Sequence, residues 1–171
     1  MNTELANYLG RIEDLRSQIS GLIADLPVQA LNWRPIAGKD DHVTNSLAIL
    51  TSHISGAEHF WIAEMVGGRP ETRVREAEFS IVATNAGEIL HFLEKTAQET
   101  REVFSNLGEL DLNGTRQVKG RIVPVRWCII HVIEHTALHL GHMQITYQLW
   151  SGGKSFPSPQ WFERLIPKED S

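Results

Sequence analysis

The feature that most constrains this chain is a run of regularly spaced histidines. Residues 126–150 read RWCIIHVIEHTALHLGHMQITYQLW and contain four of them: His131, His135, His139 and His142. At 3.6 residues per turn these four fall within an arc of roughly 80° on one helix. Burying several imidazoles without partners is costly, because each leaves a donor or an acceptor unsatisfied. A bound cation would satisfy several at once, so the run predicts a helix that contributes to a metal site.

Apolar side chains on the same helix face set the expected direction of the histidines. Leu138, Ile145 and Leu149 lie on that face. An apolar stripe normally turns toward the core of a bundle. We therefore expect the histidines to point inward.

Composition limits the class of protein. The chain has 171 residues, 42% of them hydrophobic and 22% charged, which predicts one globular domain over residues 1–171. The formal net charge is −5. An acidic chain without a basic run is not expected to bind nucleic acid. We expect five scattered cations to be solvated loop residues: Arg73, Arg75, Arg116, Lys119 and Arg121.

The expected compartment is the cytoplasm. Cys128 is the single cysteine, so no disulfide can form within the chain. The N-terminal residues alternate charged and apolar side chains, unlike a signal peptide. No stretch approaches the ~20 apolar residues that a membrane span needs, so we expect no contact with a membrane.

The hydrophobic periodicity predicts an all-α fold. Apolar residues recur at three- and four-residue spacing in four long segments, approximately residues 3–24, 44–66, 84–107 and 125–151. A short β-hairpin turning at Lys119–Gly120 is predicted before the last long helix, and a short helix at 158–166 in the tail. The expected architecture is a four-helix bundle. Its loops are long enough to permit a crossover connection.

A histidine on the second helix strengthens the prediction of a metal site. His135 and His139 have the i, i+4 spacing that places two imidazoles on one side of a helix. His53 lies on the apolar side of the second predicted helix and supplies a third nitrogen. Three protein ligands leave a coordination position open for water or substrate, as in catalytic sites. The alternative is that each histidine is buried and satisfied by a carbonyl or a carboxylate.

Two segments carry a resemblance to a known family. They read WRPIAGKDDHVTNSLAILTSHISGAEHFWI and WCIIHVIEHTALHLGHMQ. Together they resemble the DinB-like superfamily of metalloenzymes, which includes thiol-dependent transferases and isomerases. The resemblance implies a four-helix bundle whose metal is held by one histidine of the second helix and by a histidine pair of the last. Carried over, these ligands are His53, His135 and His139.

The chain departs from many members just after the last ligand. They have Arg-Gly-Gln where this chain has Leu140, Gly141 and His142. The branch with Gly-His there, near the mycothiol-dependent maleylpyruvate isomerase, looks more similar. His142 and Glu134 are therefore candidate catalytic residues.

Neighbouring residues have further candidate roles. Glu58 is a further candidate acid or base. His131 could orient His135 or line the cavity, and we expect Cys128 to be an inert buried thiol.

The expected function is that of a divalent-metal enzyme. Zinc and nickel are the favoured ions and iron is a further candidate. The resemblance implies a thiol-dependent S-transferase or isomerase that acts on a small electrophile with a low-molecular-weight thiol as cosubstrate. A metal-dependent hydrolase would use the same open position. A non-catalytic bundle for metal sensing, stress response or dimerisation is a third hypothesis. The expected partners are a small-molecule substrate and, in a homodimer, a second copy of the chain.

Overall fold

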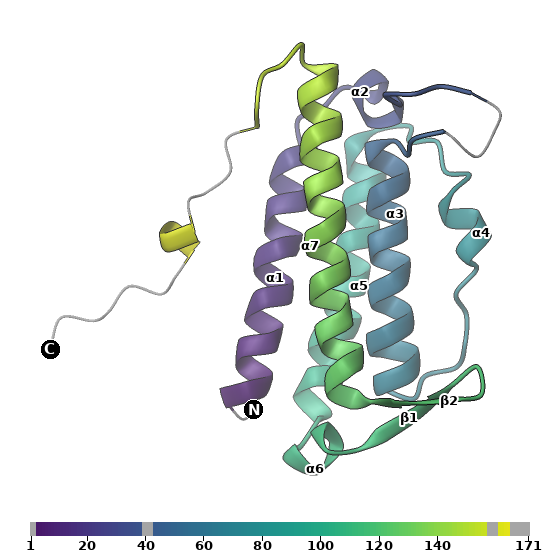
Figure 1. Cartoon of the computed structure of the whole chain (residues 1–171), viewed down its shortest axis with the longest axis vertical. Coiled ribbons are helices and arrows are strands. Elements are labelled where there is room, and N and C mark those ends of the chain that lie inside the picture. The colour runs from purple at the N-terminus through teal and green to yellow at the C-terminus, as the bar shows by residue number, and fades with distance from the viewer. Residues whose placement is uncertain (1–2, 39–42, 157–160, 165–171) are drawn as a thin grey trace, which may run out of the picture.

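Four long helices form the body of the protein (Figure 1). The computed structural model describes residues 3–38, 43–156 and 161–164. The long helices are α1 (Thr3–Ile23), α3 (Leu47–Glu58) with its continuation η1 (His59–Val66), α5 (Ala86–Asn106) and α7 (Val125–Trp150). They bury apolar side chains that recur at helical spacing; those of α1 are Leu5, Ile12, Leu15, Ile19, Leu22 and Ile23. The predicted four-helix bundle is confirmed.

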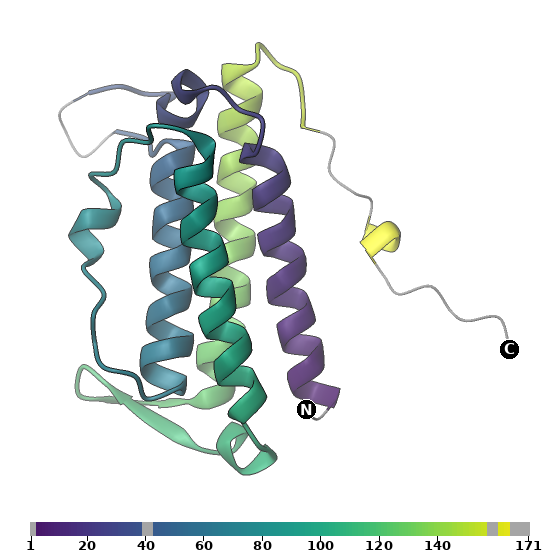
Figure 2. The ribbon, with the colours of Figure 1, turned by 180° about the vertical axis from the view of Figure 1, so that it is seen from behind.

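The helices do not follow a simple up-and-down order. α1 and α7 run in one direction and α3 and α5 in the other (Figures 1 and 2). Because α3 and α5 are successive and parallel, the link over residues 67–85 returns along the outside of the bundle. It contains the short helix α4 (Arg75–Glu78). α7 packs between α1 and α3, so the histidine run faces the second long helix.

Two of the long helices begin two or three residues later than predicted. The second long helix was predicted from residue 44 and begins at Leu47, because the Ser46 side chain accepts a hydrogen bond from the Ile49 amide at 3.3 Å. The third was predicted from residue 84 and begins at Ala86. There the Asn85 side chain accepts from the Glu88 amide at 2.9 Å.

The second long helix changes its winding halfway. From His59 to Val66 it is a π-helix, and the Gly67 amide donates to the Ile62 carbonyl, five residues earlier, at 2.8 Å. A Cβ on Gly67 would lie 2.7 Å from both the Ala63 oxygen and Val103. Only glycine therefore fits at the end of this segment.

The predicted hairpin is present. β1 (Thr115–Val118) and β2 (Arg121–Pro124) pair in antiparallel fashion, and Val118 faces Arg121 across the turn. Lys119 and Gly120 have φ values of 48° and 75°, as the two central residues of a type I′ turn require. The hairpin lies across the lower end of the bundle in Figure 1.

The remaining elements are short. The described residues include three short helices that the sequence did not predict: α2 (Val28–Asn32), α4 and α6 (Glu109–Leu112). Of the helix predicted at 158–166, residues 161–164 form the 3₁₀ turn η2 (Trp161–Arg164), and the others lie outside the described residues. No described helix combines the length and apolarity needed to cross a bilayer.

A buried polar group lies inside the bundle. Glu58 is 2% exposed and accepts hydrogen bonds from Arg16 of α1 and, at 2.5 Å, from the Thr100 hydroxyl of α5. Its Oε1 is thus used by two other helices. Glu58, a candidate acid or base in the sequence, is bonded to α1 and α5 and serves to join three helices.

Candidate metal centre

The histidines of α7 lie at the border between its buried and exposed sides. The buried residues of α7 are Val125, Cys128, Ile129, Val132, Thr136, Leu140, Met143 and Thr146. Leu138, Ile145 and Leu149 are 59%, 58% and 56% exposed. The expectation that these three leucine and isoleucine side chains mark an inward face is wrong. At 100° per residue the histidines fall between them and the buried stripe.

Three histidines converge where α7 meets α3. His53 is buried, His135 and His139 are half-buried, and one ring nitrogen of each lies within 4.8 Å of the others. The Nε2 atoms of His53 and His135 are 3.1 Å apart. Zinc–nitrogen bonds of about 2.0–2.1 Å in a tetrahedral site separate two ligand nitrogens by roughly 3.3 Å. The structure therefore brings together all three predicted ligands at a spacing that suits a metal.

A carboxylate on the crossover link fixes the ring of His53. His53 Nδ1 donates to Glu78 Oε2 at 2.8 Å, which leaves Nε2 without a proton. The Arg73 guanidinium donates two hydrogen bonds to the same carboxylate, at 2.6 and 2.9 Å. Burial alone would raise the pKa of Glu78, but the hydrogen bonds from His53 and Arg73 outweigh it and hold the pKa below its ordinary value. Glu78 is thus an anion that orients a candidate ligand.

Sequence reasoning missed this pair. Arg73 was expected to be a solvated loop residue, but its side chain is only 14% exposed. Glu78 belongs to the link over residues 67–85, which has no hydrophobic period. No spacing in the sequence relates Glu78 to His53, and only the folded link places them together.

The two candidate metal ligands on α7, His135 and His139, are neutral at neutral pH. Burial, followed by the charges of His139 and His53, lowers the pKa of His135 to about 3. Burial, followed by the charges of His53 and His142, lowers the pKa of His139 to about 4. Neutral imidazole is the form that binds a metal. At neutral pH both rings are therefore ready to act as ligands.

The two candidate catalytic residues occupy different positions. His142 is exposed, and its Nδ1 lies 3.3 Å from His139 Nδ1, so it is adjacent to the three histidines. Glu134 is exposed and acts on His131, where its charge opposes the fall in pKa that burial causes. The structure thus places His142 at the site and Glu134 beside His131.

His131 and Cys128 are not brought to the three histidines as ligands. The His131 ring stacks on Trp127 at 4.7 Å, and its centroid lies 5.7 Å from that of His135. Cys128 is fully buried in an apolar cluster, and burial raises the pKa of its thiol. The expectation of a buried Cys128 thiol is confirmed, and a raised pKa keeps that thiol unreactive.

A cavity of about 560 Å³ borders this centre. His139 and His142 form one side of it. Its other walls are mostly apolar and come from the segment before α3, from α3 itself and from the end of α7: Ile36, Val43, Leu50, Ile145 and Leu149. A space of this size holds a small organic molecule.

Comparisons with known proteins agree with the fold. The chain matches the model of the DinB superfamily over residues 11–143, and no curated protein matches it. A conserved protein of Enterococcus faecalis has a similar structure, with a TM-score of 0.69 at 14% identity over 89% of this chain and 99% of that one. A DinB-like protein of Bacillus cereus ATCC 10987 gives 0.70 at 19% identity over 89% and 95%. The narrower likeness to the maleylpyruvate isomerase branch stays a prediction.

Proposed function

Since the chain belongs to the DinB superfamily, we propose that it is a metal-dependent enzyme built around His53, His135 and His139. Its reaction is the transfer or isomerisation of a small electrophile with the help of a low-molecular-weight thiol. One observation carries the proposal: three imidazoles converge at the edge of a cavity that is large enough for a small molecule. The thiol chemistry follows from the resemblance in the sequence.

The donor set suits a divalent transition metal. Neutral imidazoles bind zinc and nickel, and also iron. His53, His135 and His139 would hold the ion, and three protein ligands would leave a coordination position for water or a substrate. When bound there, the metal supplies a Lewis acid that lowers the pKa of a thiol or a water molecule.

The residues of the chain supply orientation and a place for the substrate. Glu78 and Arg73 hold the His53 ring in one tautomer. A proton on His139 Nδ1, donated to His142 Nδ1, would leave His139 Nε2 free as a ligand and keep the proton of the neutral His142 ring on Nε2, from which it can be donated. The apolar walls hold the carbon body of an electrophile and keep water away from it.

The cavity also favours an enzyme over a non-catalytic bundle. A structural or sensing site needs no room for a second molecule beside its ligands. Here the candidate ligand His139 forms part of the cavity wall. This supports the enzyme.

A direct test is a rate measurement with zinc-loaded and nickel-loaded protein. The substrates are N-acetylcysteine methyl ester and 1-chloro-2,4-dinitrobenzene, with 4-nitrophenyl acetate as a separate hydrolase substrate. We expect metal-dependent acceleration of the thiol reaction that His139→Ala removes and that His91→Ala, an exposed histidine on α5, retains. Acceleration of ester cleavage alone would replace the transferase by a hydrolase. No metal-dependent acceleration of either reaction would refute the enzyme.

A further inference from the structure

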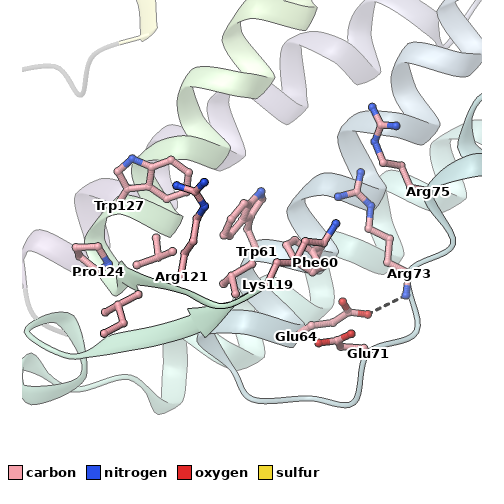
Figure 3. Close-up of a pocket in the computed structure, with 13 residues that line it drawn as sticks. Phe60, Trp61, Glu64, Glu71, Arg73, Arg75, Lys119, Arg121, Pro124 and Trp127 are labelled. Carbon is pink, nitrogen blue, oxygen red and sulfur yellow. Dashed lines mark hydrogen bonds between the residues drawn. The ribbon is translucent and has the colours of Figure 1, made fainter.

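A second and larger cavity lies at the other end of the histidine run. Its volume is about 1000 Å³, and it is enclosed by η1, the start of the crossover link and the hairpin (Figure 3). Three aromatic side chains form its apolar walls: Phe60, Trp61 and Trp127. Trp127 is 45% exposed, although tryptophan is normally largely buried. The cavity therefore offers flat, accessible aromatic surface to a ligand.

The polar wall of this cavity is positively charged. It contains four cations, Arg73, Arg75, Lys119 and Arg121, and two carboxylates, Glu64 and Glu71. Arg73 and Glu64 are already used within the protein. Arg73 binds Glu78, and Glu64 Oε1 accepts from the Thr72 and Arg73 amides at 2.5 and 2.9 Å.

Three of the four cations therefore remain available to a ligand. Among the described residues, Arg75, Lys119 and Arg121 form no ion pair, and Arg75 lies over the Phe79 ring at 4.9 Å. In Figure 3 Arg121 rises from the hairpin on the side of Trp127, and Arg75 lies on the opposite side. A chain with a net charge of −5 thus surrounds a hollow whose charged groups, with Arg73 offset by Glu78, sum to +1. Such a hollow attracts anions.

Two paths of ring contact join the cavity to the candidate metal centre. Trp127 stacks on His131, which lies next to His135. On the other side Arg75 covers Phe79, whose ring centroid is 4.9 Å from that of His53. Two side chains thus lie between the cavity and the three histidines on each path.

We propose that this cavity binds a small organic anion that has a flat apolar body and a carboxylate or a phosphate. The body packs against Trp61 and Trp127, whose rings are inclined by 72° to each other, and the anionic group pairs with Arg121 and Lys119. This deepens the proposed function, on which it rests only for the role of the anion as substrate or cosubstrate. Binding itself needs no metal.

The test uses isothermal titration with 2-naphthoate and its neutral analogue 2-naphthamide, which share the same ring system. The titrations are run on the full chain, metal-loaded and after chelation, because an anion could also coordinate a metal directly. We expect 2-naphthoate to bind at least about tenfold more tightly than 2-naphthamide in both forms. Titration with 2-naphthyl phosphate shows whether the cations prefer phosphate to carboxylate. Equal affinity for the charged and neutral ligands would overturn the proposal.

Matched variants locate the effect. Lys119→Gln/Arg121→Gln should remove the preference for the anion, and Lys95→Gln/Lys154→Gln, which removes two exposed cations elsewhere, should retain it. Trp127→Leu should weaken both ligands to a similar extent. A preference that survives in Lys119→Gln/Arg121→Gln would also refute the site. Metal content measured on the same samples separates a failure of this cavity from a failure of the histidine centre.

Discussion

Gly56 leaves room for the carboxylate of Glu78: a Cβ on Gly56 would stand 2.1 Å from Glu78 Oε1. Gly56 follows His53 by three residues, so the two share one face of α3. Glycine inside a helix is less stable than alanine by roughly 0.5–1 kcal/mol. Glycine at position 56 therefore lowers the stability of the helix but leaves the space in which Glu78 reaches His53 Nδ1.

Replacing Gly56 by alanine should weaken metal binding. The added methyl group displaces Glu78, and His53 then loses its hydrogen-bond acceptor. Loss of such an outer partner typically costs about 10–100-fold in metal affinity. Competition with a chelator measures this for zinc.

The control for that variant is Gly10→Ala. Gly10 lies in α1, and a Cβ at this position would have no neighbouring atom within 4 Å. Alanine should therefore raise stability by roughly 0.5–1 kcal/mol and leave zinc affinity unchanged. Equal zinc affinity in Gly56→Ala and Gly10→Ala would contradict the role given to Gly56.

The charge of Glu78 should matter apart from its size. Glu78→Gln keeps the shape but removes the anion that His53 and Arg73 bind, so we expect zinc affinity to fall by about 10–100-fold. Glu76→Gln makes the same change on an exposed neighbour in α4 and should have no effect. If the two variants bound zinc alike, Glu78 would have no part in holding the site.

The sequence allowed the three converging histidines to be predicted because helical spacing fixes which residues share a face. His135 and His139 follow each other by one turn, and His53 lies on the apolar side of its helix. The direction of the face was predicted wrongly. α7 carries apolar residues on both sides of its histidines, so exposed Leu138 and Ile145 could not be told from core residues by type.

Glu78 and Gly56 could not have been predicted for a different reason. Their contact joins the crossover link to the middle of α3, and its geometry depends on how the link packs after the helices have associated. The link has no hydrophobic period that would show which of its carboxylates turns inward. A hairpin turn depends on residues that are adjacent in the sequence, and the turn at Lys119–Gly120 was predicted correctly for that reason.

Acid should destabilise the metal-free protein through the histidines. Burial lowers the pKa of His135 to about 3 and that of His139 to about 4, from an ordinary value of 6.5. Below pH 6.5 the unfolded chain therefore binds more protons than the folded one. The contribution of the neutral rings to stability is complete above pH 6.5 and is lost as the pH falls toward 3.

Urea unfolding of chelated protein at pH 7 and pH 5 measures this effect. We expect the free energy of unfolding to fall between these two values in the wild type, and to fall less in His135→Gln/His139→Gln. An equal decline in both proteins would show that other groups cause it.

We expect Glu58 to stabilise the fold and to have no part in metal binding. Its side chain and that of its partner Arg16 are 2% and 7% exposed, so removing the carboxylate leaves a buried guanidinium unpaired. Breaking a buried pair in this way costs about 3–5 kcal/mol. We therefore expect Glu58→Ala to lose that much stability in urea unfolding while its folded fraction still binds zinc. A stable Glu58→Ala that failed to bind zinc would instead assign Glu58 to the metal centre.

We propose that His53, His135 and His139 hold one metal ion. Elemental analysis of tag-free protein, after incubation with zinc or nickel and removal of the free ion, tests this directly. We expect about one ion per chain in the wild type and in His91→Ala, as for a three-ligand site, and little or none in His53→Ala and His139→Ala. A wild type without metal, or His139→Ala with a full complement, would contradict it.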